Sequence, residues 1–143
     1  MAYETEKTYD TELAERIASI ELCTVELEQI PLDAFHTESF ARSIFLRTLD
    51  EVETDIVELA NDIGMAQRDL VEIKELGLGA SYEEPKEAFL LAGRAILERF
   101  VARYRAIKPI LDGAHADIDE FCLEDAQSHV AHIEYALRPI NLA

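Results

Sequence analysis

The last helical stretch of the sequence carries the residue types that could bind a metal ion. Asp125, His129 and His132 are separated by four and then three residues, so a helix presents all three side chains on one side. Cys122 lies on the same stripe. Carboxylate, imidazole and thiolate groups are the usual ligands of zinc and related transition metals. The spacing makes these four residues the candidate metal-ligating group of the chain.

A structural role competes with metal binding at this group. The helical period places His129 near the middle of an apolar face, where an imidazole without a hydrogen-bond partner is costly to bury. Asp125, one turn earlier, can supply that partner. A closed zinc site usually has four protein ligands, and a single helix supplies this group. We therefore favour a hydrogen bond between Asp125 and His129, and we expect neither a metal nor another cofactor.

The rest of the sequence holds no catalytic motif. The Glu-x-x-His pairs that ferritin-like di-iron helices require do not occur. No glycine-rich phosphate loop follows a strand pattern, no serine or cysteine stands in a nucleophile motif, and there is no Cys-x-x-Cys. These patterns predict a protein without enzymatic activity.

The charge of the chain limits its partners. The 143 residues include 30 Asp and Glu against 13 Lys and Arg, a net charge of −17. Such a charge repels nucleic-acid phosphates and anionic membranes, so we expect neither as a partner. It is typical either of a solvated surface that keeps the protein soluble or of a surface that binds a basic protein or imitates DNA.

The sequence also predicts a cytoplasmic protein. No apolar run approaches the ~18 residues of a membrane span, and the start, MAYETEKTYD, is acidic where a signal peptide is basic and then apolar. Cys23 and Cys122 both fall in helical patterns, and we expect reduced thiols rather than a disulfide.

Apolar periodicity predicts one all-α domain over residues 1–143, a bundle of five helices with a frayed leader at 1–9. The predicted helices span 11–30, 38–63, 66–76, 84–108 and 114–138. Gly64 is placed to end the second helix, Gly77 to Ala80 form a long turn, and Pro109 ends the fourth helix.

Two of these helices carry the clearest apolar faces. The second has a seam with alternating steps of four and three residues: Phe45, Leu49, Val52, Ile56, Leu59 and Ile63. The outer surface of the same helix is predicted to be strongly negative, from Asp50, Glu51, Glu53, Asp55 and Glu58. The fourth helix has an apolar face broad enough to need neighbours on several sides: Phe89, Ile96, Phe100, Tyr104 and Ile107.

Residues 76–100, LGLGASYEEPKEAFLLAGRAILERF, resemble the stretch of bacterial sensor globins that leads into their G helix. The shared features are Gly77-Leu78, an aromatic residue at Tyr82, and the pair Ala88-Phe89. The haem-ligating histidine of that family would fall near Ile73, and this chain has no histidine between His36 and His115. The resemblance therefore implies a globin-like arrangement of helices and a haem-free sensory or scaffolding domain, like those of stressosome regulators.

Together these patterns predict a non-enzymatic acidic helical protein that acts by protein–protein interaction in a regulatory or assembly role. A basic protein partner fits the charge, and a homo-oligomer remains open. Two other functions stay as alternatives. One is an acidic inhibitor, such as an immunity protein or DNA mimic, acting through the carboxylates of helix 38–63. The other is a small metalloprotein that uses the last helix.

Overall fold

The described part of the chain is helical in a computed structural model, which describes the backbone of residues 2–112 and 120–140 and the side chains of residues 14–111 and 127–140. The elements are α1 (Ala2–Gln29), α2 (Ala34–Thr37), α3 (Ser39–Leu76), α4 (Ala80–Asp112), α5 (Glu120–Leu137) and the 3₁₀ helix η2 (Arg138–Ile140). These residues contain no strand. The predicted all-α bundle is confirmed.

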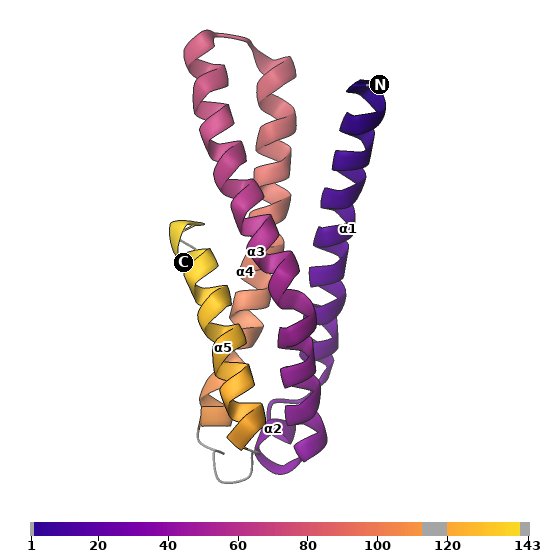
Figure 1. The fold of residues 1–143 in the computed structure, drawn as a ribbon, viewed down its shortest axis with the longest axis vertical. Coiled ribbons are helices and arrows are strands. Elements are labelled where there is room, and N and C mark those ends of the chain that lie inside the picture. Colours follow the sequence, from indigo (N-terminus) through magenta and orange to yellow (C-terminus); the bar gives the residue numbers. More distant parts are fainter. Residues whose placement is uncertain (1, 113–119, 141–143) are drawn as a thin grey trace.

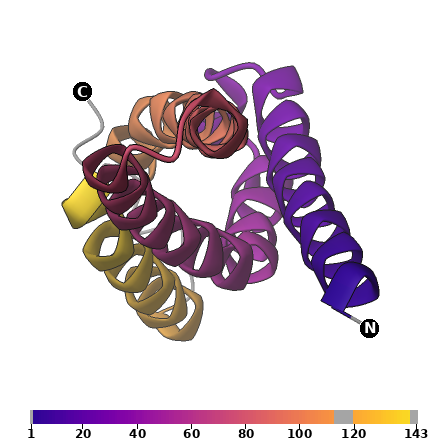
Figure 2. The same cartoon turned by 90° about the horizontal axis from the view of Figure 1, so that it is seen from above.

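The four long helices α1, α3, α4 and α5 form an up-and-down bundle, and α2 lies in the connection between α1 and α3 (Figure 1). The view along the bundle shows the four helices arranged around a common centre (Figure 2). Ion pairs fix the antiparallel register of α1 on α3: Arg16 lies 2.5 Å from Asp62, and Arg47 lies 2.7 Å from Glu26. None of the helices in the described residues is both long and apolar enough to cross a membrane.

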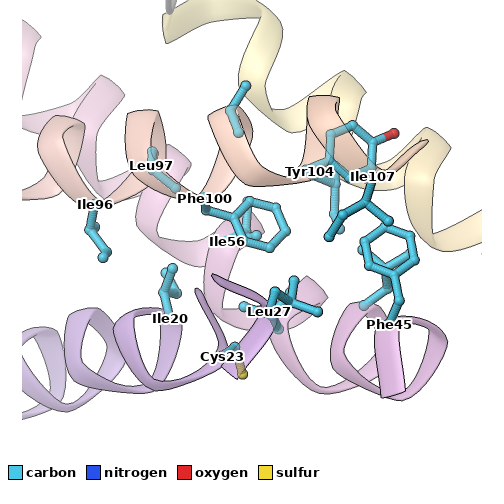
Figure 3. Packing of buried hydrophobic residues seen from close by; sticks show 14 of the residues in the cluster. Ile20, Cys23, Leu27, Phe45, Ile56, Ile96, Leu97, Phe100, Tyr104 and Ile107 are labelled. Carbon is cyan, nitrogen blue, oxygen red and sulfur yellow. The ribbon is translucent and has the colours of Figure 1, made fainter. Parts of the chain in front are cut away.

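The seam predicted for residues 45–63 forms the centre of the core. Its six side chains are between 0 and 2 % exposed. On α4, Phe100 and Ile107 are fully buried and Tyr104 is nearly so, which confirms most of the predicted apolar face. From α1, Ile20 and Leu27 complete the packing (Figure 3). Burying one Leu, Ile, Val or Phe side chain contributes about 1.5–3 kcal/mol to stability. The seam of α3, which buries six such side chains, is therefore the main stabilising element.

Two threonines lie in this core with no exposed surface, and each bonds within its own helix. Thr24 donates to the carbonyl oxygen of Ile20 at 2.7 Å, and Thr48 donates to that of Ile44 at 2.8 Å. A hydroxyl bonded to the carbonyl one turn earlier leaves no unsatisfied polar group. Thr24 therefore interrupts the apolar pattern of α1 without breaking the packing.

Arginines cap the C-terminal ends of helices, whose last carbonyls have no intrahelical donor. Arg103 on α4 donates to the carbonyl oxygen of Leu27 at 3.0 Å and also to that of Ile30, at the end of α1. Arg42 donates to carbonyls of α2, and Arg94 donates to the last carbonyl of η2. These bonds fasten each helix end to a neighbouring helix.

The predicted helices 38–63 and 66–76 are one helix, α3, because Gly64 does not end it. The φ angle of Gly64 is not positive, so Gly64 has an ordinary helical conformation. Ile63 and Ala66, on either side, are both buried. The packing of these side chains outweighs the cost of about 1 kcal/mol for glycine in a helix.

The end of α3 lies at Gly77, where φ is 65°. The Gly77 N–H donates to Lys74 O and the Leu78 N–H donates to Ile73 O, each at 3.2 Å. This pair of bonds is the Schellman motif, which needs a left-handed residue and therefore favours glycine. The long turn predicted from Gly77 is thus a tight helix cap.

Three further boundaries differ from the prediction. Helix α1 begins at Ala2, so the residues predicted as a frayed leader are helical. Pro109 lies inside α4, which continues to Asp112 because Leu111 is buried in the core. The predicted connector 31–37 contains α2, whose Phe35 is fully buried. Residues 114–119 of the predicted last helix lie outside the described residues.

Replacing Gly64 with Ala should stabilise the protein by about 0.5–1 kcal/mol, because alanine restricts the unfolded chain. A Cβ at Gly64 would meet nothing within 4 Å. The matched control is Gly77→Ala, which should destabilise by about 1–2 kcal/mol, because φ at Gly77 is positive. Urea unfolding measures both changes. A loss of stability in Gly64→Ala would contradict a continuous α3.

Replacing Phe100 with Ala should cost about 3–5 kcal/mol, because it removes a fully buried aromatic ring and leaves a cavity. The control on the same helix is Leu91→Ala, whose side chain is 75 % exposed and whose loss should change stability by less than about 0.5 kcal/mol. Thermal or urea unfolding distinguishes the two. Equal effects would show that α4 does not bury the face described here.

Candidate functional site

The two histidines of α5 meet a carboxylate of α3. His129 Nδ1 lies 2.7 Å from Glu53 Oε2, and His132 Nδ1 lies 2.5 Å from Glu53 Oε1. His129 also reaches α3 through Nε2, which lies 3.3 Å from Asp50 Oδ1. The side chains of Glu53 and His129 are 18 % and 13 % exposed, whereas His132 is 65 % exposed. We call these four residues the histidine–carboxylate cluster.

The contacts with Glu53 indicate which nitrogen of each imidazole carries a proton. An ionised carboxylate only accepts hydrogen bonds, so each Nδ1 must carry the proton that it donates to Glu53. A metal ion binds an imidazole nitrogen that has no proton. Metal binding at either Nδ1 would therefore have to displace a hydrogen bond to Glu53. The hydrogen bonds of the cluster hold α5 against α3.

The predicted metal-ligating group is only partly described. His129 and His132 do lie on one side of α5, as their spacing predicts, but the acid that they share is Glu53 of another helix. The side chains of Asp125 and Cys122 lie outside the described residues, so the bond between Asp125 and His129 stays a prediction. Within the described residues, no group of three or more His, Cys, Asp or Glu could hold a metal ion.

Glu53 is predicted from the sequence to lie on the outer surface of its helix, and this prediction is wrong, because Glu53 lies at the contact with α5. The spacing of Glu53 from the apolar residues of its helix already indicates this position. Glu53 follows Leu49 by four residues and precedes Ile56 by three, so it borders the buried seam. What the spacing does not show is which helix packs against that border, and α5 supplies the histidines.

The other carboxylates predicted for the outer face of α3 also have partners. Ser19 donates to Asp55 at 2.8 Å, Arg16 lies 2.6 Å from Glu58, and Arg47 lies 3.5 Å from Glu51. Those contacts hold α1 against α3 or brace α3 itself. This face is therefore partly occupied by intramolecular bonds.

Cys23 is a buried, free thiol, as predicted. Burial raises the pKa of Cys23, and the nearby carboxylates of Glu51, Glu26 and Asp55 raise it further. Only the thiolate is a good nucleophile or metal ligand, so these surroundings disfavour both kinds of chemistry. Cys23 serves as a small apolar side chain in the core (Figure 3).

No protein-family model matches this chain, and no match was found among curated proteins or among solved structures.

Replacing His129 with Gln should destabilise the protein by about 1–3 kcal/mol, because it disturbs hydrogen bonds between α5 and α3 that are largely shielded from water. His132→Gln is the matched control. His132 contacts the same carboxylate from an exposed position, so its replacement should cost less than about 1 kcal/mol.

Neither variant should change the metal content, and a chelator should leave the melting temperature of the wild type unchanged. Elemental analysis and thermal unfolding of untagged protein measure these quantities. A melting temperature that falls with chelator and returns with zinc would replace the structural interpretation with a metal site.

Proposed function

We propose that this chain is a non-enzymatic helical protein that binds another protein through the tip of its α3–α4 hairpin, in a regulatory or assembly role. The hairpin extends past the C-terminal end of α5, so α5 does not cover its tip (Figure 1). The tip consists of residues 72–84, which include the end of α3, the Gly77 cap and the start of α4.

The observation that carries the proposal is the composition of this tip. Leu76, Leu78 and Tyr82 are 64, 45 and 57 % exposed within seven residues of the chain. Single exposed apolar residues are normal, whereas a group of them on a projecting element is typical of an interaction site. Tyrosine is also enriched at the centres of protein interfaces.

The charges around these side chains indicate a basic partner. Four carboxylates of the tip have no ion-pair partner in the described residues: Glu72, Glu75, Glu83 and Glu84. The nearby lysines are engaged, because Lys74 lies 3.7 Å from Glu87 and Lys86 lies 3.3 Å from Asp69. An apolar centre with an acidic border fits a basic protein surface that has its own apolar residues.

The resemblance of residues 76–100 to sensor globins supports the same proposal, since it implies a haem-free sensory or scaffolding domain. That stretch includes Leu76, Leu78 and Tyr82. The acidic-inhibitor alternative predicts binding through the outer face of α3 instead. The two proposals place the binding surface on different residues, so substituting those residues distinguishes between them.

The test is capture of partners from the native host on immobilised wild-type protein, compared with a Leu76→Ser/Tyr82→Ser variant. Removing two apolar side chains from an interface should cost at least about 1.4 kcal/mol, a tenfold loss of affinity. The control is Leu22→Ser, an exposed apolar residue of α1 (73 % exposed). Melting temperatures should stay within a few degrees of the wild type in both variants.

We expect the tip variant to lose a partner that the Leu22 variant retains, and added salt to weaken the wild-type complex. Equal capture by wild type and tip variant would contradict this proposal. Loss of capture in Glu51→Lys, with the tip variant unaffected, would favour the acidic inhibitor.

A further inference from the structure

Both ring nitrogens of His129 face carboxylates of α3. Nδ1 lies 2.7 Å from Glu53 Oε2, and Nε2, which is shielded from solvent, lies 3.3 Å from Asp50 Oδ1. In a neutral imidazole, one nitrogen carries a proton and the other only accepts hydrogen bonds. A neutral His129 would therefore place an unprotonated nitrogen against a carboxylate oxygen, in a position that water does not reach.

A protonated His129 removes this conflict, because both of its nitrogens then carry a proton and face an opposite charge. Burial by itself favours the neutral ring, but two carboxylates at such short distances favour the charged one, and shielding from water strengthens their attraction. The net charge of −17 acts in the same direction. The proton belongs on the imidazole and not on an acid, because the ordinary pKa is about 6.5 for histidine and about 4 for Asp and Glu.

His132 contacts the same carboxylate without this constraint. Its Nδ1 lies 2.5 Å from Glu53 Oε1, and its side chain is 65 % exposed. Water can therefore meet the second nitrogen of His132, and a neutral ring satisfies both contacts. The geometric reason for a charged ring applies to His129 and not to its neighbour one turn later.

Acids dominate the titratable groups on the two helices that meet at His129. They are Asp50 and Glu53 on α3, with Asp125 and His132 on α5. Asp125 precedes His129 by one helical turn, and its side chain lies outside the described residues. The ion pair between α4 and α5 lies elsewhere on α5 and joins Lys108 to Glu134 at 3.7 Å. The cation on α4 is therefore already paired with another carboxylate.

We propose that His129 is protonated in the folded protein at neutral pH and that this proton makes the contact between α5 and α3 sensitive to pH. Packing of α5 on α3 then takes up a proton. Its contribution is complete at and below about pH 6.5, the ordinary pKa of histidine, and is lost as the pH rises until the folded protein releases the proton. Ile133 of α5 is 1 % exposed, so a loosened α5 uncovers apolar surface. This inference does not depend on the partner proposed for the hairpin tip.

NMR spectra that correlate the ring protons and nitrogens of histidine give the protonation state directly. In wild-type protein at pH 7.5, both nitrogens of His129 should carry a proton. A pH titration should give His129 a higher midpoint in the folded protein than in the same protein unfolded in urea. A neutral His129 at pH 7.5, or a midpoint no higher than in urea, would overturn the proposal.

Two adjacent acids of α3 provide a matched pair of variants. Asp50→Asn should weaken proton binding at His129 by at least about threefold, because it removes a charge that faces the ring. Glu51→Gln makes the same change of net charge, but Glu51 contacts Arg47 instead. It should weaken proton binding by less than about twofold. Both acids are more than half exposed, so both variants should fold. Equal effects of the two would contradict a specific contact with Asp50.

Hydrogen exchange tests the effect on α5. Between pH 6.5 and pH 8, protection of the α5 amides, corrected for the intrinsic exchange rate, should fall by at least about threefold relative to that of α1. In His129→Gln, which cannot titrate at this position, the ratio should stay constant. A constant ratio in the wild type, or the same fall in His129→Gln, would show that His129 does not control the packing of α5.

Discussion

The packing of α1, α4 and α5 on α3 is the constraint on which the rest of the structure depends. The fully buried seam of α3 is the surface that the other long helices share. Gly93 of α4 faces this seam closely, because a Cβ at that position would lie 3.1 Å from Ile63 Cδ1. Interiors are packed too densely to absorb such a contact without a shift. This seam also explains why α3 continues through Gly64, because a break there would separate two buried parts of one surface.

Ion pairs between the helices add specificity to this apolar packing. With few cations available, the chain uses most of them between helices: Arg16 joins α1 to α3, and Arg99 joins α4 to α1 with a Nη2 to Glu28 distance of 2.5 Å. The Arg99 hydrogen bond lowers the pKa of Glu28. Exposed pairs of this kind add little stability individually. They do set the register between helices, which apolar contacts alone specify weakly.

Even with its cations used in this way, the chain keeps a net charge of −17, and the binding surface that we propose at the hairpin tip shares that acidic character. The hairpin tip combines exposed apolar side chains with carboxylates that form no ion pair among the described side chains. The tip that we propose as a binding surface is thus both apolar and acidic, which fits a basic protein with apolar residues of its own.

The sequence alone determined the helical class and most of the core, because apolar residues at steps of three and four must lie on one face of a helix. Phe45 to Ile63 and Phe100 to Ile107 illustrate this. Local signals failed where packing opposed them, since Gly64 and Pro109 both lie inside helices. Only the tertiary structure decided which helices meet. It brought Glu53 of α3 to the histidines of α5, because contacts between distant segments depend on how whole helices pack and not on local spacing.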